Sequence, residues 1–200
     1  RRDRPVVTLG TASPTAGTET AREIFTELRR AKAGHELSLI RRAVDATAAG
    51  HALVSGLIRA GVTERQIQIE LEAEFFRHGG NRTGYGTIVG AGSNSAVLHF
   101  APSRREIREG DFVLVDAGGE IDRYMADVTR TYVVGEPSAF QRDLYQVVLA
   151  AEETAIARCR PGAEWKDLHL AAAVEMVGGL VAMGVMRGTP ESLVEQEAHT

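Results

Sequence analysis

Apolar side chains recur at spacings of three and four residues in three early stretches of the chain, a pattern typical of amphipathic helices. The first helix is expected to begin near residue 18 or residue 20, the second to span 36–60, and the third to span 63–78. Gln66 follows Thr63 at the spacing of a capping box, which marks the start of the third helix. These three segments are predicted to be packing helices.

The periodicity changes after Gly84, where short runs of β-forming residues alternate with turn residues. The expected elements, in chain order, are strands at 85–89, 96–100, 112–117 and 124–134 and helices at 140–160 and 165–186. The first two strands are separated by GAGSN and predict one hairpin, and the next two predict a second. Helices, then strands, then helices favour an α+β fold over alternating βαβ units.

Two aspartates stand in the second predicted hairpin, GDFVLVDAGGEIDRYMADVTRTYVV. If the chain reverses near Ile121 and Asp122, Asp116 lies directly opposite Asp127, with Cβ atoms about 4.5 to 5.5 Å apart. Two carboxylates at that distance in a largely apolar strand pair repel each other unless a positive charge lies between them. A divalent cation is the simplest candidate, so the pair predicts a metal site.

Thr129 and Thr131 are predicted on the same strand face as Asp127, where a hydroxyl can orient a carboxylate that binds metal. The alternatives are structural, with Asp116 as a turn-capping residue before the two glycines and Asp127 as a surface strand residue. The matched facing of the two carboxylates favours the metal site.

His99 stands near the end of the second strand of the first predicted hairpin, just before a loop. From that position a histidine can reach a cleft and donate a hydrogen bond or move a proton. The alternative is a structural histidine. The other histidines up to His169 lie in or beside helical stretches and are predicted to be surface or packing residues.

Composition and charge exclude several function classes. A net charge of -4 without a long basic run argues against nucleic acid and membranes as partners. Cys159 is the single cysteine, and the chain has no run of about 20 apolar residues, so a soluble, cytoplasmic protein is expected. The segment GYGTIVGAGSN matches no phosphate-binding motif.

Residues 1–18 are expected to be a linker or the remnant of an N-terminal domain.

Two motifs resemble the metallopeptidase family with the pita-bread fold, in its Xaa-Pro aminopeptidase and prolidase branch: YGTIVGAGSNSAVLHF and GDFVLVDAGGEIDRYMADVTRTYVVG. The resemblance implies an α+β, creatinase/aminopeptidase-like fold, in which helices cover an antiparallel sheet, and makes 19–200 a partial catalytic domain. By resemblance, Asp116 matches the first metal-ligand aspartate and Asp127 the aspartate that bridges two metals. His99 matches the histidine that contacts substrate and stabilises the reacting carbonyl, and Tyr85 matches a tyrosine near the cleft.

The resemblance also implies the chemistry. In this branch two divalent ions, usually Mn²⁺, share a water or hydroxide and polarise the scissile carbonyl. The implied reaction is hydrolysis of the peptide bond between an N-terminal residue and proline. A proline-containing peptide is the expected substrate, and a homo-oligomer is the expected assembly.

In the family, two glutamates and two further histidines follow in a segment that begins about where this sequence stops, at EQEAHT. The fold is therefore expected to be incomplete at the C-terminus, and two aspartates alone are expected to bind metal weakly. One hypothesis is a peptidase catalytic domain whose last third is not in this chain. The others are a non-catalytic pita-bread binding module, an inactive truncated product, and a self-sufficient protein with a structural cation site.

Overall fold

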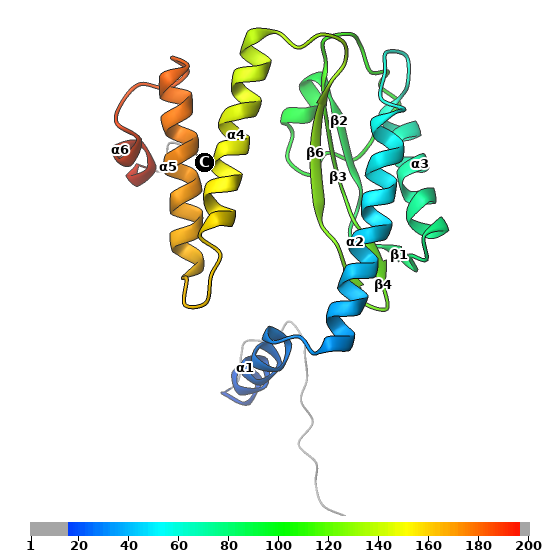
Figure 1. Ribbon diagram of the computed structural model, residues 1–200, viewed down its shortest axis with the longest axis vertical. Coiled ribbons are helices and arrows are strands. Elements are labelled where there is room, and N and C mark those ends of the chain that lie inside the picture. Colours follow the sequence, from blue (N-terminus) through cyan, green and yellow to red (C-terminus); the bar gives the residue numbers. More distant parts are fainter. Residues whose placement is uncertain (1–15, 197–200) are drawn as a thin grey trace, which may run out of the picture. The chain divides into compact units, whose positions relative to one another are not determined.

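The structure, a computed structural model, describes residues 16–196, with side chains from residue 21 onward (Figure 1). The described residues form two compact units, which divide in the sequence between Val134 and Gly135. The first unit contains helices α1 to α3 and the strands, and the second contains helices α4 to α6. Most of the predicted linker 1–18 lies outside the described residues.

The three helices predicted before the strands are confirmed, with shifted ends. They are α1 (Ala16–Arg30), α2 (Gly34–Ser55) and α3 (Glu64–Arg77). Helix α2 ends at Ser55, before the predicted residue 60, with Gly56 as its C-cap. The predicted capping box of α3 is present, since the Thr63 hydroxyl accepts from the Gln66 amide while the Gln66 side chain accepts from the Thr63 amide at 2.8 Å.

The larger sheet is antiparallel and has the order β2-β3-β6. Its strands are β2 (Ile88–Ala91), β3 (Phe112–Ala117) and β6 (Val128–Val133). Side chains of the central strand β3 alternate, so that Val113, Val115 and Ala117 are buried on one face while Asp116 points to the other. Mixed helices and antiparallel strands confirm the predicted α+β class.

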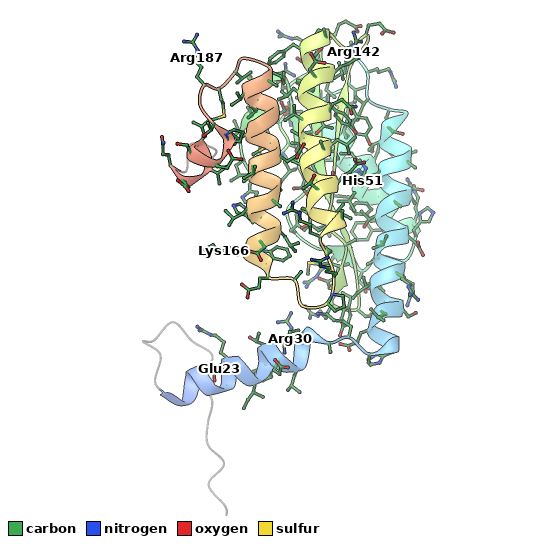
Figure 2. All side chains as sticks on the ribbon, turned by 60° about the vertical axis from the view of Figure 1, so that its left-hand side comes forward. Glu23, Arg30, His51, Arg142, Lys166 and Arg187 are labelled. Atoms are coloured by element: carbon green, nitrogen blue, oxygen red, sulfur yellow. The ribbon has the colours of Figure 1, made fainter. Side chains whose placement is uncertain are left out.

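Helices α2 and α3 cover the buried face of this sheet (Figure 1). Leu71 and Phe75 of α3 are fully buried in one cluster with Val113 and Val115 of β3. His51 of α2 points toward the strands, with Nε2 3.4 Å from the carbonyl oxygen of Ala117 (Figure 2). Burial lowers the pKa of His51, which agrees with its predicted role as a packing histidine.

A smaller antiparallel sheet continues from the larger one in the order β1-β4-β5. Its strands are β1 (Arg82–Thr83), β4 (Gly119–Ile121) and β5 (Tyr124–Met125). The pairing of β3 with β6 runs on into the pairing of β4 with β5, so the chain from 112 to 133 is one long two-stranded ribbon. The ribbon reverses at Asp122 and Arg123, whose φ angles of 49° and 75° are those of a two-residue hairpin turn.

The first predicted hairpin is wrong. Residues 96–100 form no strand, and β2 pairs instead with β3, which is distant in sequence. Of the expected turn GAGSN, Gly90 and Ala91 end β2, and the other three residues begin a 3₁₀ helix, η1 (Gly92–Ala96). The short run of β-formers after η1 finds no partner strand among the described residues, so its local preference is overridden.

The second unit consists of helices α4 (Ala139–Ala157), α5 (Trp165–Ala182) and α6 (Pro190–Glu195). Helix α4 starts at a capping box formed by Ser138 and Gln141, directly after Pro137. Helices α4 and α5 pack against each other, and α6 packs on α5. Across residues 16–196, no helix has the length and apolar character needed to cross a membrane.

Candidate functional site

Both predicted metal-ligand aspartates lie on the long ribbon, at the same end of the larger sheet. Asp116 is half-buried near the end of β3 and points away from the helix-covered face. Asp127 is exposed and directly precedes β6. The ribbon therefore brings the two carboxylates together from its two strands.

The predicted pairing of Asp116 with Asp127 is wrong by two residues. Asp116 pairs with Thr129, because the chain reverses at Asp122 and Arg123 rather than one residue earlier. Residues two apart on a strand share a face, so Asp127 is the diagonal neighbour of Asp116 on the same face. The facing of the two side chains is thus as predicted, although the register is not.

The hydroxyl of Tyr85 lies between the two carboxylates. Its oxygen is 2.5 Å from Asp116 Oδ1 and 2.9 Å from Asp127 Oδ1. Tyr85 comes from the loop between β1 and β2, where the Gly84 amide donates to the Gly118 carbonyl at 2.8 Å. Burial and then the hydrogen bonds to both aspartates raise the pKa of Tyr85 far above its usual range, so the hydroxyl keeps its proton.

This arrangement fits a bound cation. A phenol has one proton and can donate it to only one of two carboxylate oxygens at a time. The other carboxylate oxygen then faces a lone pair of the Tyr85 oxygen at 2.5 to 2.9 Å, and the two repel each other. A positive charge nearby would offset this repulsion. Carboxylate oxygens are ligands that suit Mn²⁺, Mg²⁺ and Ca²⁺.

The aspartate pair alone would fill only part of the coordination shell of a cation. Within the described part of the chain, no three or more His, Cys, Asp or Glu side chains are grouped so that they could hold a metal ion. Two carboxylates leave most coordination positions of such a cation to other ligands.

Thr129 and Thr131 lie on the face of the sheet that carries Asp116. They pair with Asp116 and Leu114, respectively, and residues that pair directly share a face. Asp127 precedes Thr129 by two residues and shares that face. The common face predicted for these three side chains is therefore confirmed.

His99 does not lie at a strand end as predicted. It is exposed, lies in the irregular segment after η1, and has a φ of 55°. Among residues 21–196, no hydrogen bond or ion pair joins His99 to Asp116 or Asp127. The structure thus brings Tyr85 and the two aspartates together and leaves the histidine on a segment of its own.

The bridging position of Tyr85 could not be found from spacing. Residues 85–89 were expected to form a strand, whereas Tyr85 lies in the loop before β2 and carries no periodic signal. Only the family resemblance pointed to this residue.

Comparison with known proteins gives the site its context. A family model described as metallopeptidase family M24 matches residues 38–189. The Xaa-Pro aminopeptidase of Escherichia coli is 37% identical over 179 residues, covering 89% of this chain and 41% of that protein. Xaa-Pro aminopeptidase 2 of Streptomyces coelicolor is 37% identical over 178 residues, covering 86% of this chain and 37% of that protein.

Solved structures agree. The aminopeptidase PepP of Pseudomonas aeruginosa has a TM-score of 0.83 at 35% identity, over 86% of this chain and 39% of its own. The proline aminopeptidase P II of Yersinia pestis has a TM-score of 0.85 at 34% identity, over 92% of this chain and 45% of its own. These likenesses confirm the predicted pita-bread fold for the part that is matched.

The chain spans about two fifths of the length of the curated relatives that it matches. Within that span the family model covers most of the described helices and strands, including Tyr85, His99 and both aspartates. The chain belongs to metallopeptidase family M24.

Proposed function

We propose that this chain is part of an Xaa-Pro aminopeptidase or dipeptidase, which hydrolyses the peptide bond between an N-terminal residue and proline. The observation that carries the proposal is the contact of one tyrosine hydroxyl with two carboxylates, Asp116 and Asp127. The names of the relatives support the substrate class, since they are Xaa-Pro aminopeptidases at 37% identity.

In this proposal Asp116 and Asp127 are ligands of two divalent cations, with Mn²⁺ as the expected metal. The remaining ligands come from polypeptide that the longer relatives possess and this chain does not match. When bound, the cations would activate water and polarise the carbonyl of the substrate. Oxygen donors alone in this part of the site agree with a hard cation.

The chain's own residues have separate tasks. Tyr85 donates a hydrogen bond to one aspartate and so fixes the orientation of that carboxylate. Thr129 and Thr131 share the carboxylate face and can donate to ligand oxygens. His99 contacts the substrate and donates a hydrogen bond to the reacting carbonyl oxygen, where negative charge develops.

The test uses the complete protein in Mn²⁺, with a tripeptide that has proline in second position and a control tripeptide with alanine there. Cleavage of the proline peptide alone is expected. Asp127→Asn and Asp116→Asn should each lower kcat by at least about 1000-fold, because a lost ligand disrupts the cation site. Asp143→Asn, an exposed aspartate on α4, is the matched control.

Two outcomes would reject the proposal. Turnover that is unchanged in Asp127→Asn would show that the aspartate pair does not carry the reaction. Stoichiometric manganese without any peptide turnover would favour a binding module that keeps the fold without the chemistry.

Several predictions from the sequence still await their own measurements. We propose that 19–200 belongs to one catalytic domain, and that the protein is cytoplasmic, forms a homo-oligomer, and has no nucleic-acid or membrane partner. The net charge of -4 supports the absence of a nucleic-acid or membrane partner, and the single cysteine supports the cytoplasmic location. Light scattering after size-exclusion chromatography and cell fractionation would test assembly and location.

A further inference from the structure

The segment that carries His99 has little regular structure of its own. After η1 the chain runs to Ser103 without a helix or strand, and Leu98 is 84% exposed. His99 has a φ of 55°, a left-handed conformation that is uncommon outside glycine. Such a conformation persists only where the surroundings hold it, so the attachments of this segment matter for the histidine.

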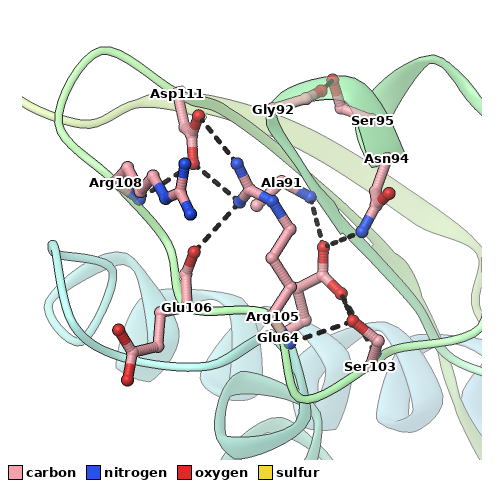
Figure 3. A network of polar contacts seen from close by, with 10 residues as sticks. All are labelled: Glu64, Ala91, Gly92, Asn94, Ser95, Ser103, Arg105, Glu106, Arg108 and Asp111. Carbon is pink, nitrogen blue, oxygen red and sulfur yellow. Dashed lines mark hydrogen bonds and ion pairs between the residues drawn. The ribbon is translucent and has the colours of Figure 1, made fainter.

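One buried carboxylate binds both ends of the segment. Oε1 of Glu64 accepts from the Ala91 amide at 2.8 Å and from Asn94 Nδ2 at 2.9 Å (Figure 3). Oε2 of Glu64 accepts from the Ser103 amide at 3.0 Å and from the Ser103 hydroxyl at 2.6 Å. Glu64 therefore links the two ends of a loop, residues 92–102, that contains His99. The Arg65 amide, which donates to the Ser103 carbonyl at 2.9 Å, adds a backbone contact at the second end.

The Glu64 side chain is fully buried, yet both of its carboxylate oxygens accept hydrogen bonds. Burial alone would raise the pKa of Glu64, but the hydrogen bonds from Ser103, Asn94 and Ala91 outweigh it and hold the pKa below its usual value. The carboxylate is therefore ionised near neutral pH, and hydrogen bonds to an ionised acceptor are the strong kind. A neutral glutamine has only one acceptor oxygen in its side chain, so it could not accept all four hydrogen bonds.

A second contact supports the same segment from its start. Arg105 and Asp111 form a paired contact at 2.8 and 3.2 Å (Figure 3). Gly92, with a φ of 56°, lies so close to this pair that a Cβ atom would come within 2.5 Å of Arg105 Nη2. The start of the segment thus packs against an ion pair, and the residue that follows its end, Ser103, is bound by Glu64. The exposed part of the segment between them carries His99.

We propose that Glu64 is a positioning residue of the active site, which acts by holding the segment 92–102 so that His99 is presented to the substrate. This inference rests on the proposed role of His99 in the peptidase reaction. The Glu64 side chain contacts Ala91 and Asn94 at the start of the segment and Ser103 after its end, so its effect on the reaction passes through the loop. Sequence patterns hide this role, because an acidic residue at the first helical position is expected merely to stabilise a helix N-terminus.

A double-mutant cycle in the complete protein tests the proposal. Glu64→Gln keeps the shape but puts an NH₂ group against the Ser103 donors, so it should lower kcat/KM about tenfold. In a His99→Ala background the same change should cost less than about twofold, because the histidine that it positions is gone. Bound manganese should be unchanged in both. Glu70→Gln, an exposed glutamate on the same helix, is the control.

Hydrogen exchange of the amides in 91–103 provides a readout that does not depend on turnover. Glu64→Gln should speed exchange in this segment and leave the β3 amides unchanged, whereas Glu70→Gln should alter neither. If Glu64→Gln folds poorly, Ser103→Ala takes its place in this experiment. Ser103→Ala removes one of the four hydrogen bonds and should speed exchange in the same segment to a smaller degree.

Three results would overturn the inference. Equal losses of kcat/KM in both backgrounds would mean that Glu64 only supports the fold, and unchanged exchange in 91–103 would mean that it does not hold the segment. Faster exchange with normal kcat/KM would separate the loop from catalysis. A complete protein without any Xaa-Pro hydrolysis would instead reject the proposed function, with the exchange data still deciding whether Glu64 holds the loop.

Discussion

Gly118 lies so close to Ala126 that a Cβ atom at the glycine would be 1.7 Å from the alanine carbonyl oxygen. Only glycine allows two backbones to approach in this way. Gly118 follows Asp116 by two residues, and Ala126 directly precedes Asp127. This close backbone approach therefore lies beside the two carboxylates of the ribbon.

Replacing this glycine should be costly. Gly118→Ala is expected to lower the free energy of unfolding by about 3 kcal/mol, because the two backbones must separate. Urea unfolding followed by circular dichroism measures this. Gly56→Ala is the control, since its nearest neighbour atom is 3.6 Å away and its φ of -83° suits alanine. Equal stability of both variants would contradict the close approach.

The turn of the ribbon predicts a change in the opposite direction. Arg123 has a φ of 75°, a conformation that costs a side-chain-bearing residue about 1 kcal/mol relative to glycine. Arg123→Gly should therefore raise the free energy of unfolding by about 0.5 to 1 kcal/mol. Thermal or urea unfolding measures this change. Arg123→Ala retains the Cβ atom and should bring no gain; stabilisation by both changes would point to the lost charge instead.

The hydroxyl of Tyr85 should matter for metal binding. Tyr85→Phe keeps the ring but removes the contact with both aspartates, so the affinity of the complete protein for Mn²⁺ should fall about 10- to 100-fold. Isothermal titration calorimetry measures the affinity. Tyr145→Phe, an exposed tyrosine on α4, should bind Mn²⁺ as the parent does. An unaltered Tyr85→Phe affinity would remove Tyr85 from the site.

Metal should also stabilise the folded protein. At a free Mn²⁺ concentration about 100 times the Kd, the free energy of unfolding of the complete protein should rise by about 2.7 kcal/mol. Asp116→Asn should abolish this gain, and EDTA should reverse it in the parent. Asp143→Asn should keep it. A gain that survives in Asp116→Asn would place the cation elsewhere.

Acid unfolding tests the buried carboxylate of Glu64. Its folded-state pKa lies below the ordinary value of about 4.3, so its stabilisation is complete above that value and is lost as the pH falls below it. Glu64→Gln should therefore cost about 2 kcal/mol at neutral pH and clearly less near pH 3. Glu70→Gln should show no such pH-dependent difference. Urea unfolding at the two pH values provides the comparison.

Local signals predicted five of the helices, because apolar periodicity marks their length, and for α3 a capping box also marks the start. The short helix α6 was not predicted. Thr63 and Gln66 have the spacing of a capping box and so predict the start of α3, and the structure shows both capping contacts. The register of the ribbon could not be predicted in the same way. Its turn residues, Asp122 and Arg123, include no glycine, although hairpin turns of this type favour one.

Tertiary contacts decide the parts that sequence patterns missed. Strand β2 pairs with β3, far along the chain, so the expected local hairpin does not form. Asp116 and Asp127 could be found because strand alternation puts them on one face. The place of Tyr85 depends on how a loop packs, and the role of Glu64 depends on partners distant in sequence.

The common register of the ribbon links its exposed tip to the carboxylates. The pairs next to the turn at Asp122 and Arg123 keep the same register as the pairs of β3 with β6, and the Ala126 amide, which donates to the Gly119 carbonyl, joins the two sets. Adding or deleting one residue at the tip would slide one strand along the other and turn its side chains to the opposite face. Exposed loop tips usually tolerate such length changes. In this ribbon the length of the tip also decides which residues of the two strands share a face beside Asp116 and Asp127.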